Sequence, residues 1–475
     1  MCGIVGIVDA GGVSIQLYYA LYALQHRGQE SAGISTFNGT TLHKFKGAGL
    51  VADVFSPAVL EELKGTTGIG HVRYPTTGSN LPENIQPLNF QFKSHSFSLA
   101  HNGNLVNTRE LRSEFEQSGQ IFTTTTDTEI IARILIDEIS ESGSVEDAVH
   151  LCMQRLQGSY SVVMMIDGVL YAFRDPLGIK PYCLGKTERG YMVASESVAV
   201  DALNGKFLRD IKPGELVRID NEGIRCTQIA VAGTHAHCIF EYIYFSRADS
   251  VIDGVLVYDV RRIIGGKLFD EDPVTADAVS PVPDSGVAYA IGYARRSGTP
   301  YAESLMKNRY MGRTFIMPNQ RQREKAVRIK LNPIQAHLAD KSVVLVDDSI
   351  VRGTTSKRII DMMREAGARE VHVRIGSPQI KAPCYLGVDM PTRQELIASD
   401  KKEEEVRKSI TASSLHHISL EALVEAIGCG KEHLCTGCLT GCYPLPIDGE
   451  EGITPQIDFI AGTYQANLGS FEAEL

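Results

Sequence analysis

One run of residues in the second half of the chain strongly limits how that half can fold. Four apolar residues, 343–346, lead directly into Asp347 and Asp348, and a loop with one glycine and two threonines follows. A short continuous apolar run that ends in a polar loop before a helix is typical of a buried strand in a parallel sheet. Such a loop can bind a phosphate through N–H groups and hydroxyls, while the two carboxylates can bind ribose hydroxyls or Mg²⁺. The run therefore predicts a phosphate site at the carboxyl end of a parallel sheet.

Other segments of the second half have the same pattern. Residues 276–282 and 371–375 are further candidate strands, and residues 356–366 form a candidate helix between strands. Strands that alternate with helices indicate βαβ units around a central parallel sheet.

The first 230 or so residues have a different pattern, in which short apolar runs alternate with turn signals. Only two helices stand out there, over residues 15–25 and 128–140, and Asp127 is the expected N-cap of the second. Many strands with few helices predict a layered α/β domain with antiparallel sheets. We place the boundary between the two domains near residues 230–240. The expected strands of the first domain are residues 2–8, 33–37, 68–72, 98–101, 161–166 and 190–194.

Length and composition exclude several classes of protein. A chain of 475 residues is expected to form two or more domains. The net charge of -10 argues against general binding of nucleic acid. No run of about 18 apolar residues predicts a membrane span, and no signal peptide precedes Cys2, so we expect a cytoplasmic protein. Ten cysteines in such a protein favour metal or catalytic roles over a disulfide framework.

Cys2 directly follows Met1, and removal of Met1 would leave a residue with both a thiol and a free α-amine. The amine has an ordinary pKa of about 8, so it can serve as the base that activates the sulfur. The apolar run after Cys2 predicts a buried strand that would hold this nucleophile still. We expect activity to require nothing beyond the removal of Met1.

Four short motifs in the first domain supply the groups that a thiol attacking an amide needs. Asn102 and Gly103 could donate hydrogen bonds to a tetrahedral oxyanion. Arg73 suits the carboxylate of an α-amino acid substrate, and Asp127 suits its ammonium group. The motifs are QHRGQ at residues 25–29, HVRYPT at 71–76, HNGNL at 101–105 and TTTDTE at 124–129.

Together with CGIVGI at residues 2–7, these motifs resemble the glutaminase domain of the N-terminal-nucleophile amidotransferases. The resemblance implies a four-layer αββα domain that hydrolyses glutamine to glutamate and ammonia at Cys2. It implies that Asn102 and Gly103 form the oxyanion hole, and that Arg27, Arg73 and Asp127 contribute to glutamine binding.

The run VVLVDDSIVRGTT at residues 343–355 resembles the phosphoribosyl-diphosphate signature of the type I phosphoribosyltransferases. Residues 281–286 resemble the pyrophosphate-side loop of that family, and residues 307–316 resemble the flap that closes over its substrate, with Arg313 as a further cation. The resemblance implies that Ser285, Asp347 and Asp348 meet Mg²⁺. It also implies that the substrate is bound by Asp347, Asp348, Ser349, Arg352, Gly353, Thr354, Thr355, Lys307 and Arg309.

A glutaminase domain joined to this transferase domain resembles the glutamine phosphoribosylpyrophosphate amidotransferase family over residues 2–444. The resemblance implies a glutaminase domain at 2–235, a transferase domain at 236–445 and a tail at 446–475. It implies that ammonia passes internally to the second site and displaces pyrophosphate from C1 of the ribose. It also implies feedback inhibition by purine nucleotides and a homodimer or homotetramer.

Two alternatives stay open at this point. A sugar-phosphate aminating synthase would share the glutaminase motifs but not the phosphoribosyl signature. A regulatory protein that binds phosphoribosyl diphosphate without catalysis would share the signature, but it would not need Cys2, Arg73, Asn102 and Asp127 as a set. Regulators of that kind also usually carry a basic DNA-binding module, which this sequence does not show.

The cysteines of the second half indicate a metal centre. Cys435 and Cys438 form a C-x-x-C pair, with Cys238 and Cys384 as distant companions. Taken alone, this pattern also fits buried free thiols or a structural zinc site. The context resembles the branch of the family that carries a [4Fe-4S] cluster, and four thiolates suit such a cluster. Cys442 and Cys429 lie near the pair in sequence and are competing candidates for a ligand.

Overall fold

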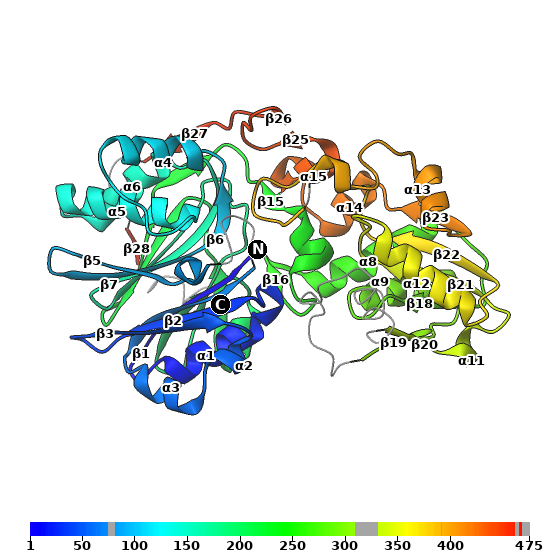
Figure 1. Ribbon diagram of the computed structural model, residues 1–475, viewed down its shortest axis with the longest axis horizontal. Coiled ribbons are helices and arrows are strands. Elements are labelled where there is room, and N and C mark those ends of the chain that lie inside the picture. The colour runs from blue at the N-terminus through cyan, green and yellow to red at the C-terminus, as the bar shows by residue number, and fades with distance from the viewer. Residues whose placement is uncertain (75–80, 309–330, 391, 461–464, 468–475) are drawn as a thin grey trace.

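The computed structural model describes residues 1–74, 81–308, 331–390, 392–460 and 465–467, which form two domains side by side (Figure 1). The first domain contains two stacked antiparallel sheets of seven strands each. The first sheet has the order β11-β9-β10-β1-β4-β2-β3 and the second the order β28-β13-β12-β8-β7-β6-β5. The strands of the first sheet are β1 (Gly3–Asp9), β2 (Ser31–Phe37), β3 (Leu42–Ala48), β4 (Thr67–Arg73), β9 (Cys183–Lys186), β10 (Gly190–Ala194) and β11 (Lys206–Asp210). Those of the second are β5 (Leu88–Phe92), β6 (His95–Leu105), β7 (Gly158–Ile166), β8 (Val169–Arg174), β12 (Glu215–Asp220), β13 (Gly223–Gln228) and β28 (Gln465–Asn467).

Helices cover the outer faces of both sheets. The apolar side chains of α1 (Ser14–Ala23) and α2 (Val51–Val54) share a core with the first sheet, beside α3 (Pro57–Glu62). Those of α4 (Thr108–Gln117), α5 (Asp127–Ser142) and α6 (Val145–Arg155) share a core with the second. A third core, which includes Ile4, Ile69, Val163 and Ala172, fills the space between the sheets. This arrangement confirms the predicted four-layer αββα domain.

The second domain is built on a parallel sheet, as predicted. Its four strands lie in chain order: β18 (Ala278–Pro281), β21 (Ser342–Asp347), β22 (Glu370–Ile375) and β23 (Ser414–His417). The main helices of this domain are α8 (Val257–Glu271), α9 (Val287–Ser297), α12 (Thr354–Glu365), α13 (Glu403–Ser409) and α14 (Leu420–Ile427). The expected strand at 276–282 is shorter than predicted, and the helix expected at 356–366 begins earlier, at Thr354.

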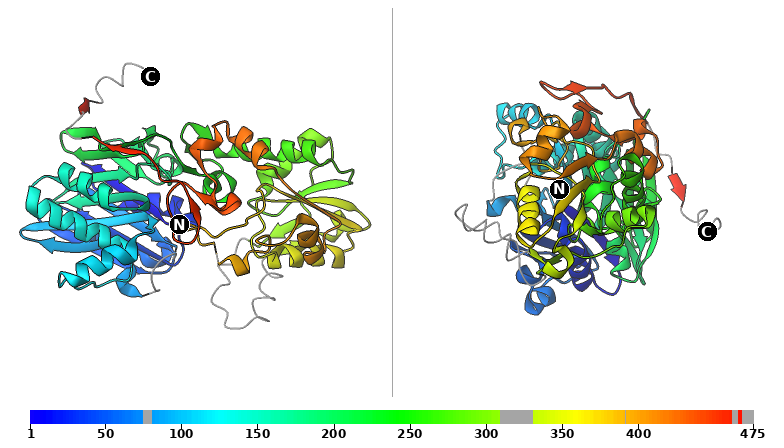
Figure 2. Two further views of the ribbon diagram at one scale, coloured as in Figure 1. Left: turned by 90° about the horizontal axis from the view of Figure 1, so that it is seen from above. Right: turned by 90° about the vertical axis from the view of Figure 1, so that its right-hand side faces the viewer.

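The chain between the domains and the end of the chain both cross from one domain to the other. After β14 (Ala230–Ala232) and β15 (His237–Cys238), a π-helical turn, η3 (Glu241–Phe245), leads into the second domain. Farther on, β27 (Ile457–Phe459) pairs with β14, and β28 pairs with β13. The predicted tail therefore returns to the first domain, as the red strands in Figure 2 show. The sequence predicted no structure for it.

The remaining elements are short. They are η1 (Gln25–Arg27), η2 (Pro82–Asn84), α7 (Val198–Asp201), β16 (Val251–Ile252), β17 (Val255–Leu256), β19 (Leu305–Lys307), β20 (Leu331–Pro333), α11 (Gln335–Leu338), η4 (Arg393–Glu395), η5 (Lys431–His433), β24 (Leu434–Cys435), α15 (Gly437–Thr440), β25 (Cys442–Tyr443) and β26 (Glu451–Gly452).

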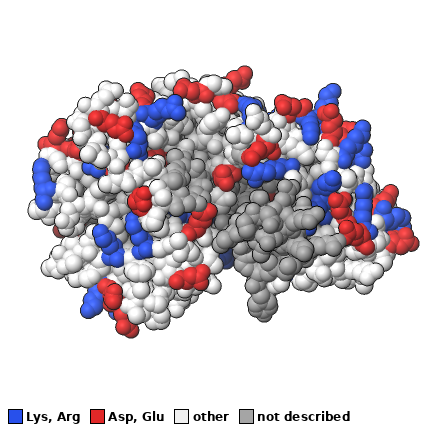
Figure 3. Space-filling view, in the orientation of Figure 1, with Lys and Arg blue, Asp and Glu red and all other residues white. Residues whose placement is uncertain are grey.

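The surface and the helix lengths bear on two sequence expectations. On the face in Figure 3, acidic and basic side chains are interspersed over both domains. Within the described ranges, no helix has the length and apolar character needed to cross a membrane. The cytoplasmic location stays a prediction.

Adjacent glycines on α8 allow a test of how the second domain is packed. A Cβ on Gly265 would lie 1.9 Å from the carbonyl oxygen of Tyr289 on α9, whereas a Cβ on Gly266 would meet its nearest atom at 3.8 Å. We predict that Gly265→Ala lowers the free energy of unfolding by about 1–3 kcal/mol, because the two helix backbones must separate. Gly266→Ala is the matched control and should be neutral or stabilising by up to about 1 kcal/mol, because alanine favours a helix. Equal stabilities of the two variants in chemical denaturation would contradict this packing.

Candidate active sites

Cys2 lies just before β1, and only 9% of its surface is exposed. Its backbone nitrogen donates a hydrogen bond to Asn102 Oδ1 at 3.0 Å, and its Sγ lies 3.6 Å from the carbonyl oxygen of Tyr74. Met1 is still attached in the described chain and is buried, with its Sδ 3.0 Å from Nζ of the buried Lys180. Cys2 is therefore held at both its backbone nitrogen and its sulfur.

Asn102 and Gly103 lie together on β6, beside Cys2. Asn102 is fully buried, and its Nδ2 has no hydrogen-bond partner among the described residues. A buried amide donor is rarely left without a partner, so this Nδ2 group is suited to donate a hydrogen bond to an oxygen of the substrate. Gly103 must be glycine, because a Cβ there would lie 1.9 Å from the carbonyl oxygen of Ser159 on the neighbouring strand β7.

Asp127 and Arg73 are both buried and lie at the ends of elements near Cys2. Arg73 is the last residue of β4, whose residue Val72 pairs with Gly3. Asp127 Oδ2 accepts a hydrogen bond from the backbone N–H of Leu105 at 3.0 Å, and its Oδ1 lies 3.6 Å from His101 Nδ1. Burial alone would raise the pKa of Asp127, but the charge of His101 and these hydrogen bonds outweigh burial and lower it. The carboxylate therefore stays ionised and can bind an ammonium group.

The prediction that Asp127 is a helix N-cap is wrong. The cap residue of α5 is Thr126, and Asp127 is the first helical residue. The Asp127 carboxylate instead accepts a hydrogen bond from the N–H of Leu105, which belongs to β6 and not to the helix.

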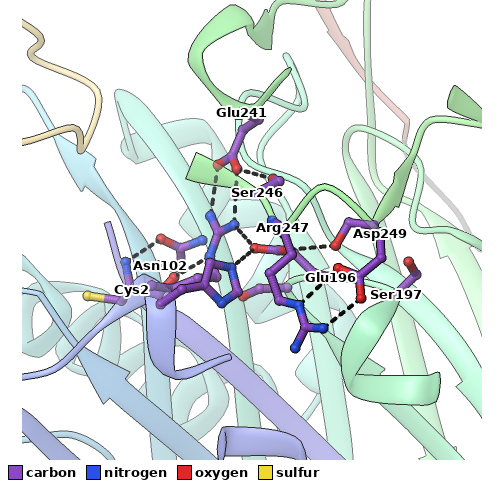
Figure 4. Close-up of polar contacts among 12 residues, drawn as sticks. Cys2, Asn102, Glu196, Ser197, Glu241, Ser246, Arg247 and Asp249 are labelled. Atoms are coloured by element: carbon purple, nitrogen blue, oxygen red, sulfur yellow. Dashed lines mark hydrogen bonds and ion pairs between the residues drawn. The ribbon is translucent and has the colours of Figure 1, made fainter. Parts of the chain in front are cut away.

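Arg27 is fully buried and is surrounded by acceptors, among them Glu196 and Glu241, which are labelled in Figure 4. Its Nε donates to the carbonyl oxygen of Cys2 at 3.0 Å, its Nη1 contacts Glu196 and Glu241, and its Nη2 donates to Glu241 at 2.8 Å. Burial alone would lower the pKa of Arg27, but the charges of Glu241 and Glu196 outweigh burial and raise it. These contacts favour a role in holding Cys2. Direct binding of glutamine by Arg27 stays a prediction.

The predicted phosphoribosyl site lies at the carboxyl end of the parallel sheet. Because β18 pairs with β21, the loop at 282–286 and the loop that begins at Asp347 lie side by side, with Val282 N donating to Val346 O at 2.8 Å. Ser349 Oγ donates to Asp348 Oδ2 at 2.7 Å, and Thr354 and Thr355 open α12 behind Gly353. Burial and the neighbouring charge of Asp348 raise the pKa of Asp347. A like-charged pair of this kind is suited to a cation.

Two other predicted residues of this site have protein partners. Lys307 forms an ion pair with Asp284, which lies in the same loop as Ser285, and this pair brings β19 to the loop at 282–286. Arg352 pairs with Glu395 at 3.1 Å on the exposed side of the loop. Arg309 and Arg313 lie outside the described residues, as do Pro75 and Thr76 of the HVRYPT motif.

The four predicted cluster cysteines come together where the domains meet. Cys238 and Cys435 are direct partners in the parallel pair of β15 and β24, and Cys438 follows on α15. Cys384 Sγ accepts hydrogen bonds from the N–H groups of Leu386 and Val388, each at 3.4 Å. Burial raises the pKa of Cys238 to about 11, and the charge of Cys384 adds to that rise.

The same four thiols also influence one another electrostatically. Burial raises the pKa of Cys438, with further contributions from Cys384, Cys435 and Cys238, whereas the main neighbours of Cys429 are Asp253 and Glu432. Within the described ranges, no group of three or more His, Cys, Asp or Glu side chains has the spacing for a metal ion. The donor set itself suits an iron–sulfur cluster, which separates its thiolates more widely than a single zinc ion does.

Sequence reasoning missed Glu196 and Glu241, the two partners of Arg27. Glu241 lies in the segment FEYIYF at 240–245, two positions after Ile239 and close to Cys238 in the sequence. A charged residue inside an otherwise apolar segment was the available signal, because a buried charge needs a partner.

Comparison with known proteins gives one consistent result. Residues 71–202 match the model of a glutamine amidotransferase domain. The chain is 52% identical to an amidophosphoribosyltransferase of Methanothermobacter thermautotrophicus over 94% of this chain and 95% of that protein. It is 48% identical to the enzyme of the same name from Methanocaldococcus jannaschii, over 95% of this chain and 99% of that protein. A solved structure of glutamine phosphoribosylpyrophosphate amidotransferase from B. subtilis, complexed with ADP and GMP, matches with a TM-score of 0.88 at 44% identity, over 94% of this chain and 98% of that one.

The unpartnered amide of Asn102 leads to a prediction. Asn102→Asp keeps the oxygen that accepts from Cys2 N but removes the Nδ2 donor. We expect the kcat of glutamine hydrolysis to fall about 10²- to 10³-fold with a smaller change in KM, because an oxyanion donor acts mainly in the transition state. A steady-state glutaminase assay measures both constants. A change confined to KM would show that Asn102 only binds substrate.

Proposed function

The chain belongs to the amidophosphoribosyltransferase family, and from this premise we propose how its residues divide the reaction. The enzyme transfers ammonia from glutamine to C1 of 5-phosphoribosyl 1-diphosphate and yields 5-phosphoribosylamine, glutamate and pyrophosphate, the first step of purine biosynthesis. The near-complete coverage and the sequence identity of the matches to amidophosphoribosyltransferases exclude the aminating synthase and the non-catalytic regulator. The observation that carries the proposal is the grouping of Cys2, Asn102 and Gly103 in one buried site.

In the first domain, Cys2 is the proposed nucleophile. Once Met1 is removed, the α-amine of Cys2 takes the thiol proton, and the sulfur attacks the amide carbon of glutamine. Asn102 Nδ2 and the Gly103 N–H stabilise the oxyanion that forms. The amine then returns its proton to the amide nitrogen, which leaves as ammonia. Water finally hydrolyses the thioester on Cys2 and releases glutamate.

The buried setting of Cys2 supports its amine as the base. Burial disfavours the charged form of an amine and lowers its pKa, so an α-amine freed at this place would be largely neutral near pH 7 and could accept a proton. Arg73 and the ionised Asp127 would bind the carboxylate and ammonium of the substrate.

In the second domain, Asp347, Asp348 and Ser285 would hold Mg²⁺. The raised pKa of Asp347 beside Asp348 supports this role, because a divalent cation relieves the repulsion between two adjacent carboxylates. The ion would supply positive charge for the leaving pyrophosphate. The loop from Ser349 to Thr355 and Lys307 would bind the phosphates, with Arg352 available once it leaves Glu395.

Ammonia would pass between the sites through the core that joins the domains. This core includes Leu177 and Ile179 of the first domain and also Val344 and Val346, on the strand that ends at Asp347. An apolar passage would keep ammonia away from water and therefore unprotonated. Closure over the second substrate would complete the passage.

We further propose that Cys238, Cys384, Cys435 and Cys438 hold a [4Fe-4S] cluster. The cluster would have a structural role, because Cys238 lies where the chain enters the second domain and the other three belong to later segments. Purine nucleotides are proposed as feedback inhibitors, since the similar B. subtilis structure contains ADP and GMP. The proposed assembly is a homodimer or homotetramer.

Because glutamine hydrolysis and ammonia transfer are assigned to separate sites, two substitutions should have different outcomes. Cys2→Ala should abolish glutamine-dependent synthesis of pyrophosphate but leave ammonia-dependent synthesis, because the second site keeps its chemistry. Asp347→Asn should abolish both activities. The assay follows pyrophosphate and glutamate with either nitrogen source, and equal loss of both activities in Cys2→Ala would refute the assignment.

The cluster assignment is tested by the iron content of anaerobically purified protein. Cys384→Ser and Cys438→Ser should lose iron and the visible absorbance band, because each removes one of four thiolates. Cys442→Ser and Cys429→Ser are the matched controls and should keep both. Iron-free wild-type protein with full activity would rule out the cluster.

A further inference from the structure

The carbonyl oxygen of Cys2 is held by Arg27, and Arg27 is bound in turn by a carboxylate from the start of the second domain, Glu241. Arg27 bridges that oxygen and two carboxylates, those of Glu196 and Glu241. All three side chains are at most 2% exposed. Figure 4 shows Glu241 and Glu196 on different segments of the chain, with Cys2 and Asn102 close by.

The two carboxylates differ in what fixes them. Glu196 follows Ser195, whose Oγ accepts from Ile4 N, and it is bound by Ser250 and by the N–H of Arg247. It therefore has several partners besides Arg27. The Glu241 carboxylate accepts two hydrogen bonds from the Arg27 guanidinium, at 3.0 Å and 2.8 Å. It accepts another from the Ser246 hydroxyl.

The position of Glu241 is set by elements of the second domain. It is the first residue of η3, a π-helical turn, and such turns often occur at functional sites. The Tyr289 hydroxyl, on α9 behind the phosphoribosyl loops, donates to Ile243 O at 2.8 Å. Arg261 on α8 donates to Tyr242 O at 2.9 Å and to Ser246 O at 2.7 Å. The turn is thus fastened on both sides of Ile243.

We propose that Glu241 is a positioning residue for glutamine hydrolysis, which acts on Cys2 through Arg27. The inference rests on the proposed role of Cys2 as the nucleophile. A carbonyl oxygen held in place fixes the backbone torsion of its own residue, and with it the directions of the α-amine and the thiol. Without the charge of Glu241, Arg27 would be drawn toward Glu196 and away from the Cys2 carbonyl.

The test compares Glu241→Gln with Glu215→Gln. Glu215 is also buried and binds Arg209 through both oxygens, at 2.8 Å and 2.7 Å, but it does not contact Arg27. In Glu241→Gln we expect the kcat for glutamine to fall about 10- to 100-fold with little change in KM, because a small misplacement of a nucleophile has effects of this size. Ammonia-dependent activity should stay within about twofold of wild type. Glu215→Gln should leave both activities unchanged, and wild-type glutamine kinetics in Glu241→Gln would overturn the inference.

A second variant and a second readout separate positioning from charge balance and from stability. Glu241→Asp keeps the charge but is one methylene too short to hold both guanidinium nitrogens, so it should remain slow, and recovery to wild-type rates would show that charge alone matters.

Inactivation by a diazoketone analogue of glutamine, which requires an aligned Cys2, should slow in parallel with kcat in both variants at temperatures where melting curves show them folded. Unchanged inactivation would leave only a structural role for Glu241. Loss of glutamine use in Cys2→Ala tests the nucleophile separately.

Discussion

The first active site depends on one buried guanidinium. Arg27 joins the Cys2 carbonyl to Glu196 of its own domain and to Glu241 at the entry to the second. Removing an ion from water costs several kcal/mol, so an arginine stays buried only where acceptors surround it. Loss of one partner of a buried pair costs about 3–5 kcal/mol, which makes this arrangement strongly dependent on both domains. The position of Cys2 therefore depends on residues of both domains.

Further contacts between the domains converge on the same site. Asn104, next to Gly103, donates to the carbonyl oxygen of Tyr385 at 2.8 Å, and Ser159 donates to that of Leu386 at 2.8 Å. This segment follows Cys384, one of the proposed cluster ligands, and its apolar residues join the core that also contains Met1 and Val346. The proposed cluster would thus stabilise the segment that supports the oxyanion hole, which gives a physical reason for a metal group without a redox role.

Local patterns predicted the elements, and long-range contacts supplied what was missed. Residues 190–194 form β10 as expected, and the strand that ends at Asp347 follows directly from its continuous apolar run. The Asp127 carboxylate accepts a hydrogen bond from Leu105, and Glu241 binds an arginine 214 positions away. The hydrophobic periodicity of a single sequence does not indicate which residues form such long-range contacts. Strands β27 and β28 of the tail were missed for the same reason, because their partners β14 and β13 lie more than 200 positions earlier.

The two proposed sites of this chain would form a single reaction unit, joined by the apolar core between the domains. The most direct test supplies glutamine labelled with ¹⁵N in its amide group together with a large excess of unlabelled ammonium at neutral pH. Mass spectrometry of the phosphoribosylamine, trapped as a stable derivative, then reports the source of its nitrogen. We expect the product to be almost entirely ¹⁵N-labelled, once the ammonia-dependent rate measured without glutamine is subtracted. Dilution of the label beyond the share set by that rate would show that ammonia leaves the protein between the two sites.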